Sequence, residues 1–113
     1  MRPLEELIGY VACFIQRGFT KRAGARNRDG DVCSTIDPTA SRWCLWGAVD
    51  AATQSHQLSL READLVWRTI NQHTSGAVSW NDRWWRTKGS VLRMLRRAAK
   101  NPYRRSYPLP EPQ

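Results

Sequence analysis

The chain has 113 residues, of which 41% are hydrophobic, and it carries a formal net charge of +8 at pH 7. This length allows one hydrophobic core and not two, and the apolar content, with six tryptophans, excludes a wholly disordered chain. No run approaches the roughly 20 apolar residues of a membrane span, and the first residues lack the pattern of a secretory signal, so we expect a cytoplasmic protein with no membrane contact.

A first helix is predicted from residue 4 to Arg17 or Gly18, because apolar side chains from Leu4 to Phe19 recur at spacings of three and four. Pro3 before it suits the first turn of a helix. The periodicity then fails over residues 20–38, where glycine, asparagine and aspartate supply turn chemistry. We expect a long basic loop there, or a small hairpin in which residues 32–36 form a short strand.

A second helix is predicted to begin at Asp37-Pro38 or at Ser41 and to run through Ala52. Its apolar residues cover nearly the whole circumference, which indicates a central and buried helix. Gly47 and Ala48 lie within it and are small enough for a neighbouring segment to approach closely.

The third and fourth predicted helices each begin at a capping residue. Ser59 and Glu62 match a capping box, and the helix that follows ends near Ser75. Its predicted inner residues are Leu60, Ala63, Val66, Trp67 and Ile70. Thr87 is the predicted cap of the last helix, whose predicted inner residues are Val91, Leu92, Leu95, Ala98 and Ala99. Residues 77–86 between the two helices are read as a connection.

The predicted fold class is therefore mainly α: a compact bundle of about four helices with a long loop or small hairpin after the first helix. Residues 1–101 form the single helical domain in this interpretation. Residues 102–113 are rich in proline and are predicted to be a flexible C-terminal tail.

Positive charge is concentrated in two stretches of the chain. Residues 83–105 hold nine of the eighteen basic side chains and no acidic one, and a second basic cluster lies within residues 17–28. A field of this sign favours nucleic acid, or an acidic or nucleic-acid-binding protein surface, as a partner. Exposed tryptophans next to arginines can also stack on bases.

We therefore expect a non-enzymatic binding protein that contacts nucleic acid or a nucleoprotein through the basic last helix and nearby tryptophans. The predicted contact residues are Arg86, Lys88, Arg93, Arg96, Arg97, Lys100, Trp80, Trp84 and Trp85. The chain contains no helix-turn-helix, zinc-finger, RRM or KH pattern, so recognition of a particular base sequence is not predicted.

Other chemistries are weaker on the sequence alone. Cys44 is a candidate catalytic nucleophile with His56 or His73 as its base. The position of Cys44 close to Trp43 and Trp46 is, however, typical of a buried structural thiol. The three cysteines and two histidines match no metal-ligand spacing, and no cofactor is predicted. Asp50 and Asp82 are a candidate carboxylate pair, although Asn81 and Asp82 are more typical of a turn or a helix cap.

Several short motifs occur together: W-C-L-W-G-A-V-D-A-A at 43–52, W-N-D at 80–82, R-T at 86–87 and V-L at 91–92. In combination they resemble a family of small, uncharacterised bacterial and phage proteins, over roughly residues 4–100. The basic Lys88-Gly89-Ser90 departs from the acidic residues expected after the threonine. The resemblance implies the helical fold and no activity. A phage-type inhibitor or adaptor that docks on a host protein complex, similar to an anti-CRISPR protein, is the alternative function it suggests.

Overall fold

The structure is a computed structural model, and it describes residues 1–103. Within this range the chain forms five α-helices and three short β-strands. The helices are α1 (Leu4–Arg17), α2 (Leu45–Ser55), α3 (Leu60–Thr74), α4 (Ala77–Asn81) and α5 (Lys88–Lys100). The strands are β1 (Ala25–Arg26), β2 (Val32–Cys33) and β3 (Arg42–Trp43). The predicted helix-dominated fold is confirmed. Helix α4 is an addition, since the sequence predicts a connection over residues 77–86; five residues are too few to show a helical period.

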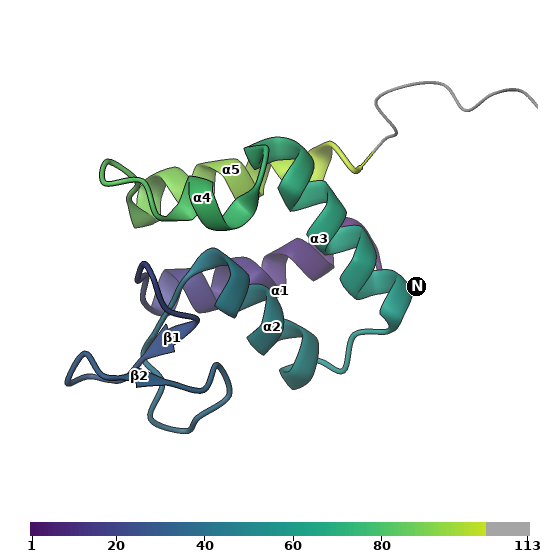
Figure 1. Cartoon of the computed structure of the whole chain (residues 1–113). Coiled ribbons are helices and arrows are strands. Elements are labelled where there is room, and N and C mark those ends of the chain that lie inside the picture. The colour runs from purple at the N-terminus through teal and green to yellow at the C-terminus, as the bar shows by residue number, and fades with distance from the viewer. Residues whose placement is uncertain (104–113) are drawn as a thin grey trace, which may run out of the picture.

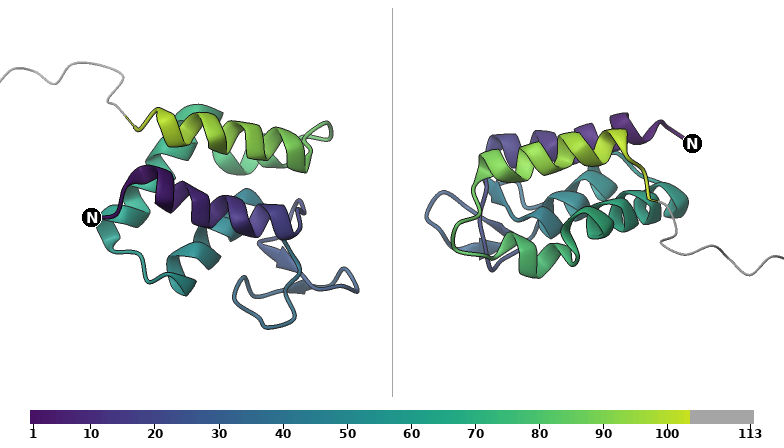
Figure 2. Two further views of the ribbon diagram at one scale, coloured as in Figure 1. Left: turned by 180° about the vertical axis from the view of Figure 1, so that it is seen from behind. Right: turned by 90° about the horizontal axis from the view of Figure 1, so that it is seen from above.

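The helices pack around α1. Helix α5 lies antiparallel beside it, α2 packs on its other side, and α3 and α4 cover the front of the bundle in Figure 1. The second view in Figure 2 shows α1 and α5 together on one side of the molecule and α3 and α4 on the other. The predicted amphipathic stripes supply this core: Leu7, Ile8, Val11 and Ile15 from α1, and Val91, Met94, Leu95 and Ala98 from α5.

The predicted start of the second helix is wrong. Residues 42–43 form β3, which pairs antiparallel with β1, and α2 begins only at Leu45 with Cys44 as its N-cap. Trp43 is buried and its indole Nε1 donates a hydrogen bond to the Thr35 carbonyl at 2.9 Å. The strand pairing and this anchored indole hold the backbone extended where the local pattern favours a helix. Six of the eleven residues of α2 are nevertheless buried, as expected.

The loop after α1 contains a small sheet with strand order β2-β1-β3. β1 and β2 form the hairpin that was one of the two expectations for this stretch. Arg26 of β1 braces the hairpin, since its Nη1 donates to the Gly30 carbonyl and its Nε to Thr20 Oγ1.

Helix α3 begins at the predicted capping box, in which Ser59 and Glu62 satisfy each other's backbone donors. Leu60, however, does not point into the core as predicted, because it is 90% exposed. The buried stripe of the helix runs through Glu62, Val66 and Ile70 at spacings of four, and Leu60 lies about 200° around the helix axis from Glu62.

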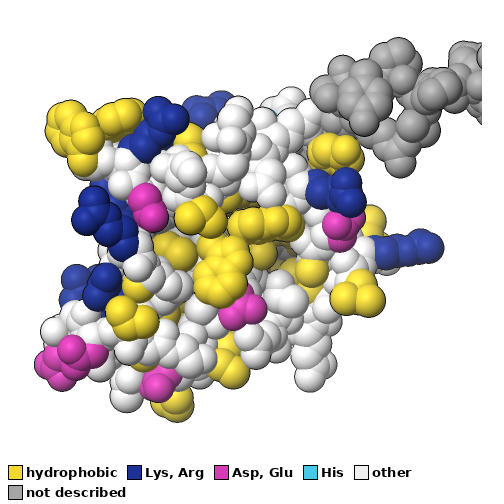
Figure 3. All heavy atoms as spheres, viewed as in Figure 1, with side chains coloured by type: hydrophobic (Ala, Val, Ile, Leu, Met, Phe, Trp, Pro, Cys, Tyr) yellow, Lys and Arg dark blue, Asp and Glu magenta, His cyan; other side chains and the backbone are white. Residues whose placement is uncertain are grey.

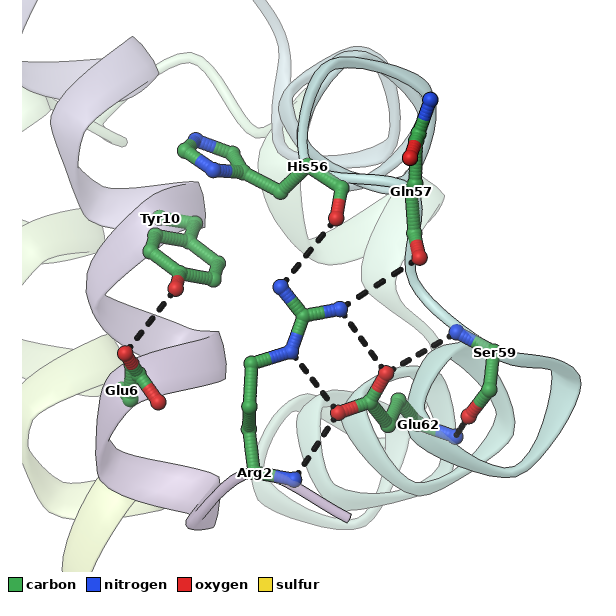
Figure 4. Close-up of polar contacts among 7 residues, drawn as sticks. All are labelled: Arg2, Glu6, Tyr10, His56, Gln57, Ser59 and Glu62. Atoms are coloured by element: carbon green, nitrogen blue, oxygen red, sulfur yellow. Dashed lines mark hydrogen bonds and ion pairs between the residues drawn. The ribbon is translucent and has the colours of Figure 1, made fainter.

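Glu62 occupies this inner position because Arg2 neutralises it (Figure 4). The Arg2 guanidinium donates to both Glu62 oxygens at 2.9 Å and also to the carbonyls of His56 and Gln57, where α2 ends. Hydrogen bonds from Arg2 and from the Ser59 backbone hold the pKa of Glu62 well below its usual range. We call this cluster of Arg2, His56, Gln57, Ser59 and Glu62 the Arg2 corner.

No helix within the described residues is long and apolar enough to cross a membrane. After α5 the chain still contacts the bundle, because the Tyr103 backbone N–H donates to Thr69 Oγ1 at 3.0 Å and Arg68 lies over the Tyr103 ring. Residues 104–113, which make up most of the predicted tail, lie outside the described residues.

Candidate functional site

Four of the predicted contact residues share one side of α5. Arg93, Arg96, Arg97 and Lys100 are all exposed, and they lie opposite the helix's buried stripe. Their spacing of three and four residues places them on neighbouring turns, over about 10 Å along the helix axis. We call these four residues the α5 basic face.

The side chains of the α5 basic face have no partner within residues 1–103. The ion pairs in this range are Arg2 with Glu62 and Arg68 with Asp64, and neither involves α5. No hydrogen bond joins the four side chains to another described residue, and no acidic residue lies in their stretch of sequence. Their charge is therefore available to an external anion.

The loop between α4 and α5 ends in a pair of exposed tryptophans. Trp84 is 85% exposed and Trp85 is 51% exposed. Their rings meet edge to face at 5.6 Å between centroids, and the Arg83 guanidinium lies 5.4 Å from the Trp85 ring. Trp85 thus has contacts on two sides, whereas Trp84 projects into solvent. We call Arg83, Trp84 and Trp85 the Trp84 tip.

The other three predicted contact residues are half-buried and make contacts within the protein. Trp80 packs against the core, and the Arg86 guanidinium stacks on its ring at 3.5 Å from the centroid. Arg86 Nε also donates to the Trp80 carbonyl, and burial, followed by the charge of Arg83, lowers the pKa of Arg86. Lys88 Nζ donates to the Gln16 carbonyl at the end of α1. These side chains position the Trp84 tip rather than project beside it.

The fold joins the two basic clusters that are separate in the sequence. Lys21 Nζ donates to the carbonyls of Arg83 and Trp84, at 2.6 and 3.1 Å. The Arg22 backbone N–H donates to Asp82 Oδ1 at 3.0 Å. Lys21, Arg22 and Arg83 are thus members of the site that the sequence reasoning missed, because no local pattern relates residues about 60 positions apart.

Figure 3 shows the result on the front of the molecule. Hydrophobic side chains project at the upper left corner, where Figure 1 draws the loop between α4 and α5. Lysine and arginine side chains lie along the same edge below it. The exposed aromatic tip is therefore bordered by positive charge from two different parts of the chain.

The candidate cysteine chemistry has no support in the geometry. Cys44 Sγ accepts a hydrogen bond from the Gly47 backbone N–H, and burial raises the pKa of its thiol. His56 instead stacks on Tyr10, and His73 Nε2 is 3.0 Å from the Asn101 carbonyl oxygen. No hydrogen bond joins Cys44 to either histidine in the described part of the chain, so neither histidine is placed to activate the thiol.

The two candidate carboxylates also have separate partners. Asp50 accepts hydrogen bonds from Thr35 and Gln54, whereas Asp82 accepts from Arg22 and Asn81. Asn81 caps α2, because its Oδ1 accepts from the Leu45 backbone N–H, which confirms the predicted structural role. Among residues 1–103, no group of three or more His, Cys, Asp or Glu side chains is placed to hold a metal ion.

Fold and surface together define a small helix-dominated protein with an exposed aromatic tip and a basic face that has no partner among residues 1–103. The chain belongs to a protein family of unknown function, DUF6197, which matches residues 1–101. Comparison with curated proteins and with solved structures found no match. Family membership thus agrees with the predicted resemblance at the level of an uncharacterised family and assigns no activity.

Proposed function

We propose that this protein binds single-stranded nucleic acid, or a nucleoprotein that exposes it, without catalysing a reaction. The observation that carries the proposal is the combination of four cations without a partner among residues 1–103, on the α5 basic face, with the exposed ring of Trp84 in the loop before the same helix. Cations that track a phosphate backbone and aromatic rings that stack on bases are the two elements by which proteins hold single strands.

The α5 basic face suits a chain of phosphates. Its four side chains have no intramolecular partner within residues 1–103, so binding breaks no ion pair there. Each phosphate that they neutralise releases condensed counterions, which supplies affinity irrespective of base sequence. Arginine contributes three of the four side chains, and its forked donors match phosphate oxygens.

The Trp84 tip favours a single strand over a duplex. An exposed indole can stack on a base only where that base is free of its neighbours, as in single strands and loops. Trp84 offers such a ring, because it is 85% exposed although it meets the Trp85 ring edge to face.

The test is binding of labelled single- and double-stranded DNA and RNA to the full chain, measured by fluorescence anisotropy at several salt concentrations. If four phosphates are neutralised, the logarithm of the association constant for a single strand falls with the logarithm of salt concentration with a slope of about −3. The double variant Arg93→Glu/Arg97→Glu should abolish binding at physiological salt and leave the fold intact.

The matched control compares two single reversals with the same change in net charge. Arg97→Glu lies on the α5 basic face, whereas Arg61→Glu lies on the exposed first turn of α3. Arg97→Glu should weaken binding strongly and Arg61→Glu only slightly. Equal effects of the two variants, or no binding at low salt, would contradict the proposal and favour the alternative, an inhibitor or adaptor of phage type that docks on a host protein complex.

A further inference from the structure

A pocket of about 300 Å³ opens beside the Trp84 tip, and its lining contains no residue of the α5 basic face. Three segments form it: residues 22–24 of the loop after α1, the start of α2, and α4 with Asp82. Its volume is at the small end of the roughly 300–1,000 Å³ typical of ligand pockets. One planar ring system and its substituents fit a space of this size.

The walls of the pocket are fixed by contacts between its segments. The Cys44 backbone N–H donates to the Gly24 carbonyl, and a Cβ on Gly47 would collide with that carbonyl, so the loop and α2 lie backbone to backbone. Asn81 joins α4 to both, since it accepts from the Leu45 N–H and donates to the Thr20 carbonyl. A preformed pocket of this kind loses little conformational entropy when it is filled.

The pocket has an aromatic wall. Trp46 is 46% exposed, and its ring lies so close to Gly24 that a Cβ there would come within 2.9 Å of Trp46 Cζ3. Val78, which is 56% exposed, contributes an apolar edge from α4. Large exposed side chains at a concave site indicate a ligand with an apolar planar surface.

The polar groups of the pocket have opposite charges. Asp82 Oδ1 accepts from the Arg22 N–H and from Asn81, while Oδ2 has no partner among the described residues. The Arg22 guanidinium also has no partner within residues 1–103. The pocket therefore offers one carboxylate oxygen to an N–H donor and one cation to an anion.

We propose that this pocket holds one unstacked base of the bound strand, packed against Trp46, with an exocyclic amino group donating to Asp82 and the adjoining phosphate near Arg22. Carboxylates pair with the amino group of cytosine in this way. A uracil ring presents carbonyl oxygens on both sides of its N3–H, and the carboxylate repels them. The site thus prefers bases that carry an amino group.

The inference rests on the proposed function and extends it to the choice of base. Pocket and tip are adjacent, because Arg22 and Asp82 line the pocket and their chain neighbours Lys21 and Arg83 are joined by the hydrogen bond from Lys21 Nζ to the Arg83 carbonyl. A strand that stacks on Trp84 therefore has the pocket within reach of a neighbouring nucleotide.

The experiment compares oligodeoxycytidine with oligodeoxyuridine of equal length, two strands whose rings are the same size and differ in the amino group. The full chain should bind oligodeoxycytidine about tenfold more tightly. Asp82→Asn keeps an oxygen for the Arg22 N–H and adds an amide donor, so the preference should vanish or reverse. Val78→Trp should fill the mouth of the pocket from an exposed position and also remove the preference.

Trp84→Ala is the control, because it should weaken the binding of both strands equally and leave their ratio unchanged. If the wild-type chain binds both strands equally, or if Asp82→Asn and Val78→Trp keep the cytosine preference, the pocket does not read the base, although nucleic-acid binding itself stands. If neither strand binds, the proposed function fails and the pocket inference fails with it.

Discussion

Two arginine-bearing regions of this molecule differ in whether the guanidinium has a partner. At the Arg2 corner, Arg2 pairs with Glu62 at 2.9 Å and donates to two further carbonyls. On the α5 basic face, three arginines and a lysine have no ion pair or hydrogen bond through their side chains in residues 1–103. The same type of side chain closes the fold in one region and is left to the solvent in the other.

The difference separates stability from binding. A carboxylate such as Glu62 at a buried position destabilises the fold unless it is paired and hydrogen-bonded, so Arg2 stabilises the folded chain. Exposed cations without partners repel one another and contribute little to packing. Substitutions in the two regions should therefore act on different measurements.

The largest expected effects come from one variant in each region, measured for both stability and binding. Arg2→Met should lower the urea midpoint by more than Ser59→Ala, a cap substitution that costs about 1 kcal/mol, because it leaves Glu62 without its cation. Its affinity for single strands should stay within twofold of wild type. Arg93→Glu/Arg97→Glu should lose binding and keep the wild-type midpoint. Circular dichroism in urea and fluorescence anisotropy on the same samples measure the urea midpoint and the affinity. A variant that changed both quantities would contradict the separation of stability from binding.

A smaller contrast lies between two tryptophans four positions apart. Trp84→Ala should reduce affinity roughly tenfold by removing a stacking ring, with no loss of stability. Trp80→Ala should cost about 2 kcal/mol of stability, because it removes an indole that packs on the core and carries the Arg86 guanidinium. A Trp84→Ala variant that unfolds more easily than Trp80→Ala would show that the tip is structural.

The smallest effect is a pH dependence at the Arg2 corner. The pKa of Glu62 is lower in the folded chain than in the unfolded chain, where it is near 4.3. The stabilisation that the charged Glu62 gives is therefore fully present above the unfolded pKa. It is lost as the pH falls from the unfolded pKa through the folded pKa. Glu62→Gln keeps the capping geometry and removes the charge. The variant should be less stable than wild type at pH 7, and the gap should narrow between pH 5 and pH 3. Urea midpoints of the two proteins at each pH measure this difference in stability. A difference that stays constant with pH would show that the ionisation of Glu62 does not contribute to stability.

Local sequence patterns were sufficient for three helices and for the α5 basic face. The spacing of Arg93, Arg96, Arg97 and Lys100 places them on one side of any helix, and apolar residues between them define the opposite side. Capping residues Ser59 and Thr87 locate two helix starts, because a cap acts on backbone groups within one turn.

The same patterns could not separate the tryptophans at 80, 84 and 85. All three precede α5 in an aromatic and basic stretch, yet Trp80 lies under Arg86 and Trp84 lies in solvent. Local sequence patterns also could not assign Lys21 to the Trp84 tip, since its hydrogen bond to the Arg83 carbonyl spans 62 positions. The start of α2 was misplaced for a related reason, because strand pairing with β1 decides the conformation of residues 42–43.

The sequence by itself determined the strong positive charge, the inner faces of α1 and α5, and the line of cations along α5. Only the tertiary structure decided that Glu62 and not Leu60 points inward, that the two basic clusters meet at the Trp84 tip, and that a pocket lined by Trp46 and Asp82 lies beside them. The physical reason is range: helical periodicity and capping act over a few residues, whereas burial, charge pairing and pocket shape depend on segments that meet only when the chain has folded.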